Sequence, residues 1–141
     1  MEYTVMGDSV NLASRLEGAS KFYDTLILIG QRTAELAKPD IEVREIDLLR
    51  VKGKREPVVV YELLGRKGQL DARKQKIIEV YLEGLAAYKT RNFSTACARF
   101  SEAVTLDPSD GPSRVYVDRS ARYRQNPPPP DWDGVYELMS K

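Results

Sequence analysis

The sequence predicts an α+β protein, with strands and helices alternating over residues 1–66 and helices over most of residues 67–141. Short apolar runs, such as residues 26–29 (LILI), and an alternating run over residues 41–46 (IEVREI) indicate strands in the first part. In the second part, apolar residues recur at the three- to four-residue spacing of amphipathic helices. Because alternating strands and helices are typical of an α/β sandwich layer, we expect a sheet packed against helices in the first part.

The predicted elements of the first part follow one another with short connections. They are a strand over 2–6, a helix over 9–21, a strand over 25–29, a helix over 31–37, and a hairpin of 41–52 and 57–64. Gly53 is expected at the hairpin turn. By itself this part would expose a sheet edge and an apolar helix stripe, so we expect that the beginning of the domain is missing from this chain.

The second part is predicted to be helical, with clear start and stop signals. Asn92 is expected to cap one helix, residues 107–108 (DP) to end it, and Pro112 to stand in the first turn of the next. The apolar positions at helical spacing are Ile78, Tyr81, Leu82 and Leu85, then Phe93, Ala96, Cys97, Phe100, Ala103 and Val104. The predicted divisions of the whole chain are 1–66 for the first domain, 67–74 for a linker, 75–126 for the helical segment, and 127–141 for a Pro-rich C-terminal tail with Trp132.

The composition excludes several classes of protein. The 141 residues include 22 basic and 21 acidic ones, so the net charge indicates neither a nucleic-acid partner nor a membrane surface. A single cysteine, Cys97, excludes an internal disulfide and indicates a reducing compartment. With no histidine, the chain offers no zinc site and no Ser-His or Cys-His pair. No apolar run is long enough to span a bilayer, so we expect this portion to be cytoplasmic, while a membrane or sensor region upstream stays open.

The most informative stretch is residues 3–17 (YTVMGDSVNLASRLE), in which Asn11 and Arg15 stand four residues apart. On a helix this spacing places the amide and the guanidinium on one side. Leu12 and Leu16 belong to the neighbouring apolar stripe, so the polar pair is expected at the edge of the buried face. An Asn–Arg pair in that position can hold an anionic group and a sugar oxygen at the same time.

Residues 7–15 (GDSVNLASR) resemble the class III nucleotidyl cyclases, the adenylate and guanylate cyclases, in which a G-[DN]-x-V-N-x-A-[SA]-R motif follows a strand. A second stretch, residues 51–63 (VKGKREPVVVYEL), resembles the V-K-G-[KR]-x-x-x-[PV] hairpin at the end of that domain. The resemblance covers residues 1–66. It implies the C-terminal portion of a ferredoxin-like α/β sandwich.

The resemblance also implies roles for individual residues. Asn11 and Arg15 would be catalytic, with Asn11 orienting the ribose and Arg15 stabilising the phosphoryl charge of the transition state. Lys52 would contact the terminal phosphates, although outside its motif it would be an ordinary solvated lysine. Thr4 falls where the family recognises the purine, and its hydroxyl favours ATP over GTP.

In this family, two aspartates from the earlier part of the domain hold Mg²⁺ or Mn²⁺. The resemblance places them before Met1, so we expect no metal ligand in this chain and no activity from the chain alone. Family cyclases work as dimers. Asn11 and Arg15 are therefore expected to act in a homodimer, or together with a complementary cyclase half.

The helical segment resembles one tetratricopeptide repeat. Gly84, Ala96, Phe100, Ala103 and Pro108 fall at the offsets of that repeat, but Ala87 stands where an aromatic residue is usual, and Tyr88 follows it. Because one repeat cannot bury its own apolar face, a helical cap or a docking element for a protein partner is expected.

Two functions stay open. One is a portion of an adenylate cyclase that converts ATP to cyclic AMP and diphosphate in intracellular signalling. The other is a non-catalytic interaction module that docks through the helical tail.

Overall fold

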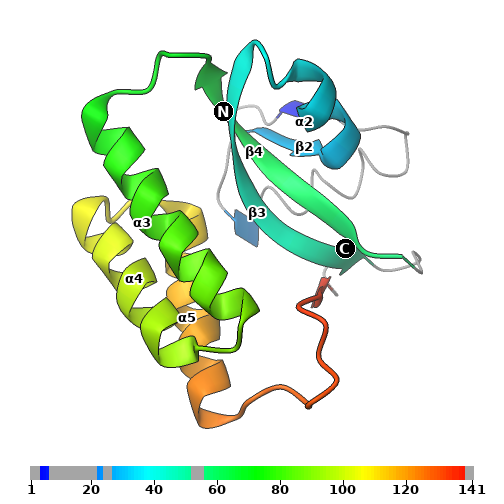
Figure 1. Cartoon of the computed structure of the whole chain (residues 1–141), viewed down its shortest axis with the longest axis vertical. Helices are drawn as coiled ribbons and strands as arrows, with labels where there is room; N and C mark the ends of the chain where they lie inside the picture. Colours follow the sequence, from blue (N-terminus) through cyan, green and yellow to red (C-terminus); the bar gives the residue numbers. More distant parts are fainter. Residues whose placement is uncertain (1–3, 7–21, 24–26, 52–55, 139–141) are drawn as a thin grey trace. The chain divides into compact units, whose positions relative to one another are not determined.

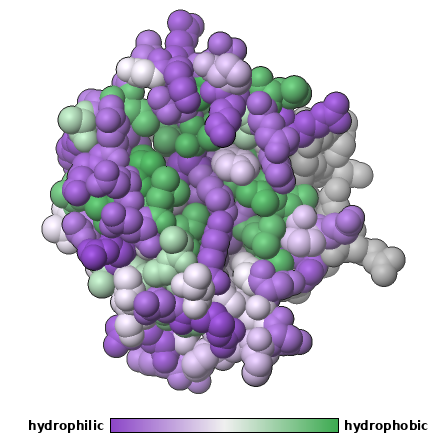
Figure 2. Space-filling view, in the orientation of Figure 1, coloured by the Kyte–Doolittle hydropathy of each residue, from purple (hydrophilic) through white to green (hydrophobic). Residues whose placement is uncertain are grey.

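The computed structural model describes residues 4–6, 22–23, 27–51 and 56–138 (Figure 1). The chain divides into two compact units, one of Met1–Leu70 with Gly134–Lys141 and the other of Asp71–Asp133. The predicted α+β class is confirmed. Within the described ranges, no helix is both long and apolar enough to cross a membrane. On the face shown in Figure 2, hydrophilic and hydrophobic residues are interspersed.

The first unit contains a five-stranded sheet with the strand order β1-β2-β4-β3-β5. Strand β1 is parallel to β2, β4 is antiparallel to both β2 and β3, and β5 is parallel to β3. The strands are β1 (Thr4–Met6), β2 (Ile27–Gly30), β3 (Ile41–Val51), β4 (Val58–Arg66) and β5 (Tyr136–Leu138). All four strands predicted in residues 1–66 are present, whereas β5 lies in the stretch predicted to be a tail.

Helix α2 (Gln31–Ala37) follows β2 directly, over the residues predicted for it, and buries Ala34. The predicted helix over 9–21 lies outside the described residues, although Phe22 and Tyr23, which follow it, have helical backbone. The hairpin turn at Gly53 also lies outside them.

Buried polar pairs connect the elements of the first unit. Arg44 of β3 is fully buried and lies opposite Glu62 of β4, with Nε donating to Glu62 Oε1 at 2.9 Å. The hydroxyl of Tyr23, also fully buried, donates to the carboxylate of Asp47. A charge buried in this way requires a partner, since its desolvation is otherwise uncompensated.

Irregular pairing explains why the burial pattern of β3 departs from the predicted alternation. The β3–β4 register shifts between Glu42 and Val43 and again between Glu45 and Asp47. Such a β-bulge changes which face the following side chains occupy. Ile46 and Asp47, adjacent in sequence, are consequently both buried.

The second unit contains the helices α3 (Ala72–Lys89), α4 (Phe93–Leu106) and α5 (Gly111–Gln125), with α4 packed against both α3 and α5. The side chain of Asn92 accepts a hydrogen bond from the backbone N–H of Thr95, which confirms the predicted cap. Helix α4 ends directly before Asp107, and α5 begins with Pro112 in its first turn, as predicted.

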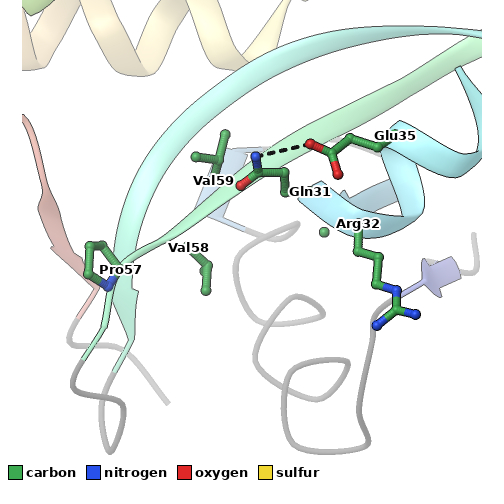
Figure 3. Close-up of a pocket in the computed structure, with 7 residues that line it drawn as sticks. Gln31, Arg32, Glu35, Pro57, Val58 and Val59 are labelled. Atoms are coloured by element: carbon green, nitrogen blue, oxygen red, sulfur yellow. Dashed lines mark hydrogen bonds between the residues drawn. The ribbon is translucent and has the colours of Figure 1, made fainter.

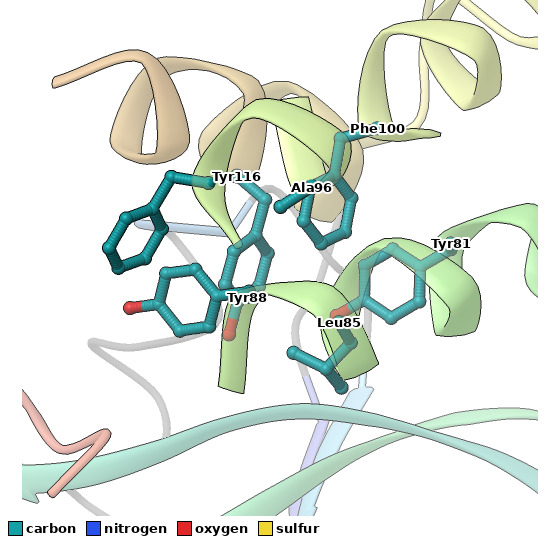
Figure 4. Close-up of a cluster of buried hydrophobic side chains, with 7 residues drawn as sticks. Tyr81, Leu85, Tyr88, Ala96, Phe100 and Tyr116 are labelled. Atoms are coloured by element: carbon teal, nitrogen blue, oxygen red, sulfur yellow. The ribbon is translucent and has the colours of Figure 1, made fainter. Parts of the chain in front are cut away.

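Aromatic side chains form most of the core of the second unit (Figure 4). Phe100 is fully buried and stacks on Tyr116 with a centroid separation of 4.8 Å. A Cβ at position 84 would lie 3.0 Å from the Phe100 ring, so glycine lets α3 and α4 approach closely. Tyr88 is 2% exposed and contacts the rings of Phe93 and Tyr116.

Two residues were predicted to lie in the core but are not fully buried, Leu82 of α3 and Cys97 of α4. Leu82 is 43% exposed, whereas Ile77 and Val80 are buried. Cys97 is only partly buried. The buried face of α3 is therefore centred on Ile77, Val80, Tyr81, Gly84, Leu85 and Tyr88.

The Pro-rich stretch packs on the helices of the second unit. Arg91, whose φ is +67°, donates to the carbonyl oxygens of Pro128 and Pro129 at 2.8 and 3.1 Å. The indole of Trp132 contacts the rings of Tyr88 and Tyr123, with centroids 5.3 and 5.7 Å away. The first half of the predicted tail is thus part of the folded second unit.

Replacing Gly84 with alanine should destabilise the chain, although alanine is the better helix former. Helix propensity favours alanine by about 1 kcal/mol, but overpacking a core costs about 1–3 kcal/mol. The Phe100 ring cannot move away easily, because Tyr81 and Tyr116 hold it in contact. We expect the free energy of unfolding in urea to fall by about 1 kcal/mol. In a Phe100→Leu background the same substitution should stabilise the chain; stabilisation in the wild-type background would contradict the close fit at Gly84.

The carboxylate of Asp107 should make stability depend on acidic pH. A hydrogen bond from the Ser109 hydroxyl, at 2.6 Å, is the main cause that lowers the pKa of Asp107, and the Ser109 N–H and Arg73 add to it. Because the folded-state pKa is depressed, the ionised carboxylate stabilises the fold above its unfolded pKa of about 3.9, and this contribution is lost as the pH falls through the folded pKa.

Ser109→Ala should therefore lower the free energy of unfolding by about 1 kcal/mol at pH 7, and the difference should shrink below about pH 4. Urea unfolding of both proteins between pH 7 and pH 2 measures this. If the two proteins differ in the free energy of unfolding by the same amount at every pH, the Ser109 hydroxyl stabilises the fold independently of the charge on Asp107.

Candidate functional site

The ends of several strands meet at one end of the sheet, here called the carboxyl end. Met6 of β1 lies beside Ile29 of β2, and the two strands are parallel. Leu49 of β3 lies beside Val58 of β4, and these strands are antiparallel. The carboxyl ends of β1, β2 and β3 therefore share this end of the sheet with the amino end of β4.

The structure places the starting points of both predicted nucleotide-binding segments at the carboxyl end. Strand β1 ends directly before residues 7–15, and β3 ends directly before Lys52. Strands β2 and β4 lie between β1 and β3, so the two strands are about 14 Å apart across the sheet at the usual strand spacing. The register places Met6 level with Glu45, so β3 runs further along the sheet than β1 before it ends at Val51.

The predicted site residues themselves are placed only in part. Asn11, Arg15 and Lys52 lie outside the described residues. Thr4 is in β1, where it pairs in register with Ile27. The roles of all four residues stay predictions.

A pocket of about 260 Å³ opens at the carboxyl end of the sheet (Figure 3). Within it, Gln31 Nε2 donates to Glu35 Oε2 at 3.3 Å, while the Arg32 side chain extends away from this pair. The lining residues are Gly30, Gln31, Arg32 and Glu35 at the end of β2 and in α2, with Pro57, Val58 and Val59 on the β4 side. One wall is therefore polar and the other apolar.

The pocket is small for a complete ligand site. Sites for drug-sized ligands are usually about 300–1,000 Å³, so this volume suits one part of a larger ligand. Gln31, Arg32 and Glu35 were not predicted as site residues. The four-residue spacing of Gln31 and Glu35 on a predicted helix was the available indication that the two side chains lie together.

The pKa of Tyr61 of β4 is shifted by burial and by the charges near the pocket. Burial raises the pKa of the Tyr61 hydroxyl, and the carboxylates of Glu45 and Glu35 raise it further. The hydroxyl is therefore protonated at neutral pH and remains a hydrogen-bond donor.

Among the residues that the structure describes, there is no group of three or more His, Cys, Asp or Glu side chains that could hold a metal ion. The expectation that the ligands of Mg²⁺ or Mn²⁺ lie outside this chain stays a prediction.

The chain is similar to several adenylate cyclases. It is 37% identical over 123 residues to the terminal-differentiation specific adenylate cyclase of Dictyostelium discoideum, a match that covers 84% of this chain. It is also 37% identical over 65 residues to adenylate cyclase 1 of Rhizobium meliloti and 42% identical over 66 residues to the adenylate cyclase of Anabaena cylindrica, covering 46% and 45% of this chain. The chain contains a cyclase-related domain.

These adenylate cyclases are much longer than this chain. The matches cover 6%, 10% and 13% of the Dictyostelium, Rhizobium and Anabaena proteins. No family model matches the chain, and no solved structure matches it. The predicted relationship to cyclases is confirmed at this level, and the tetratricopeptide-like character of the second unit stays a prediction.

Proposed function

We propose that the chain is the C-terminal portion of an adenylate cyclase, in which Asn11 and Arg15 serve the conversion of ATP to cyclic AMP and diphosphate in intracellular signalling. The observation that carries this proposal is the 37–42% identity to adenylate cyclases. The sheet topology supports it, because β1 and β3, which directly precede residues 7–15 and Lys52 in the sequence, both end toward the carboxyl end of the sheet.

In the proposed reaction the ribose 3′ oxygen forms a bond to the α-phosphorus, the bond from that phosphorus to the bridging oxygen breaks, and diphosphate leaves. Asn11 orients the ribose so that its hydroxyl can attack in line. Arg15 offsets the charge that develops on the phosphoryl oxygens, a charge-assisted contact that strengthens in the transition state. Lys52 binds the terminal phosphates, which become the leaving group, and Thr4 contacts the adenine.

The proposed enzyme is assembled from two halves. Asn11 and Arg15 act across the interface of a homodimer or of a complex with a complementary cyclase half, which supplies the ligands of Mg²⁺ or Mn²⁺. The isolated chain is accordingly inactive, and the assembled enzyme works in the cytoplasm.

A complementation assay tests this proposal. The chain is mixed with a homologous adenylate cyclase whose own Asn–Arg pair has been replaced by alanine, and cyclic AMP is measured with ATP and Mn²⁺. We expect product from the mixture and none from either protein alone. No product from the mixture would overturn the proposed catalytic role, and product from the chain alone would overturn the division into halves.

The second candidate is a non-catalytic module that docks through a tetratricopeptide-like second unit. It is favoured by a pocket of about 180 Å³ on α4 and α5, lined by Ser101, Val104, Arg114 and Val117. Failure of the complementation assay would make this the better supported function.

A further inference from the structure

The chain leaves the sheet and returns to it. After β4 it forms the whole of the second unit, and only then does β5 pair with β3. In this parallel pairing, Tyr136 lies beside Leu49, Glu137 beside Arg50 and Leu138 beside Val51. Strand β5 thus pairs with the carboxyl-terminal end of β3.

Side chains also fix β5 to the first unit. Val135, directly before the strand, is 8% exposed. The ring of Tyr136 stacks on Phe22, with centroids 5.9 Å apart and planes inclined by 30°. Phe22 in turn contacts the edge of the Tyr23 ring at 5.0 Å, and Tyr23 donates to Asp47 of β3. Tyr136 therefore connects two places on the first unit, the end of β3 and the pair Phe22–Tyr23.

These two places adjoin the segments that carry the predicted site residues. Val51 directly precedes Lys52, and Phe22 follows Arg15 by seven residues. We propose that residues 135–138 form a C-terminal strap that fixes both places, and that Tyr136 is a positioning residue for the nucleotide site. The positioning role rests on the proposed function, whereas the strap rests on the contacts alone.

The strap is expected to depend strongly on the Tyr136 ring. A three-residue strand at the edge of a sheet has few backbone hydrogen bonds and opens at low free energy. The ring stack and the burial of Val135 add to what holds it. Phe22 is 39% exposed, so loss of the stack leaves no large internal cavity and the domain should stay folded.

The first measurement is hydrogen–deuterium exchange of the backbone amides in the purified chain. Tyr136→Ala should raise the exchange of residues 49–51 and 22–23 by about tenfold, the factor that loss of an aromatic pair implies. Tyr136→Phe keeps the ring and should raise the exchange less than Tyr136→Ala does. Leu36→Ala, which removes an apolar side chain that is 74% exposed in the same unit, is the matched control and should change nothing at these residues.

The second measurement places the same variants in the complementation assay. Tyr136→Ala should lower kcat/KM for ATP by about tenfold or more, because a small displacement of groups that bind a substrate is costly. Leu36→Ala should stay within about twofold of the wild type, since it leaves the stack in place, and Tyr136→Phe should lose less than Tyr136→Ala does.

The two measurements test the strap and the positioning role of Tyr136 separately. Unchanged exchange in Tyr136→Ala would overturn the strap. Raised exchange with unchanged kcat/KM would overturn the positioning role. If the wild-type chain fails to complement, the proposed function falls and the positioning role with it, while the exchange data still decide whether the strap exists.

Discussion

Replacing Arg15 with alanine should reduce cyclic AMP formation in the complementation mixture by about 100- to 1,000-fold, the usual loss for one oriented donor to a transition-state oxyanion. The guanidinium presents several N–H donors in a fixed plane, which matches the oxygens of a phosphoryl group. Arg15→Lys keeps the charge but loses this geometry, so we expect it to recover only a part of the rate. Asn11→Ala should cause a loss of similar size, because the ribose is no longer oriented.

The control for Arg15 is a second arginine whose loss changes the charge equally. Arg122 of α5 pairs with Asp118 on the surface, so Arg122→Ala should leave turnover within a few-fold of the wild type. Circular dichroism and thermal unfolding should show each variant folded. If Arg15→Ala also stays within a few-fold of the wild type, the proposed catalytic role is wrong.

Replacing Phe100 with alanine should lower the free energy of unfolding by about 3–5 kcal/mol. The ring is fully buried and contacts Tyr81 and Tyr116, and Gly84 packs directly against it. Alanine would leave a cavity that these rigid neighbours fill poorly. Urea denaturation, followed by the circular dichroism of the helices, measures the loss.

Leu82→Ala is the matched control for Phe100, because it also shortens an apolar side chain of the helical unit. Leu82 is 43% exposed, so the change in the free energy of unfolding should stay within about 0.5 kcal/mol. Equal losses for the two variants would contradict the packing described for α3 and α4.

The helical unit could be predicted well from local signals, since caps, turns and spacing depend on neighbouring residues. The stripe on α3 was misplaced because Ile77, Val80, Ile78 and Leu82 are all apolar, and spacing alone does not choose between adjacent faces. Packing of Ile77 and Val80 with Ala103 and Leu106 makes the choice. The close approach of α3 and α4 at Gly84 belongs to the same packing.

The structure of the first unit is harder to predict, because it depends more on contacts between residues that are distant in the sequence. Strands β1 to β4 carry apolar runs that local patterns reveal, but β5 is only three residues long and follows a stretch rich in proline and aspartate. It becomes a strand through pairing with β3. Arg44 likewise looks like a solvated residue until its partner Glu62 is known to lie opposite on β4.

Some residues of the candidate site could likewise be predicted from local sequence, whereas others depend on contacts between distant elements. The motif residues Asn11, Arg15 and Lys52 could be found from their fixed spacing within short stretches. The pocket residues Gln31 and Pro57 come from separate elements, and their proximity depends on the order of strands in the sheet. Only the fold could bring them together.

The late return of β5 has a consequence for how the protein is made. A ribosome completes β3 and β4 long before it reaches Tyr136, so the outer edge of β3 lacks its final partner while the whole helical unit is synthesised. Unpaired strand edges are templates for aggregation, and pairings between distant residues form slowly. The nascent chain is therefore most exposed to misassembly during this interval, and a polypeptide released before Tyr136–Leu138 is made would keep that edge unpaired by β5.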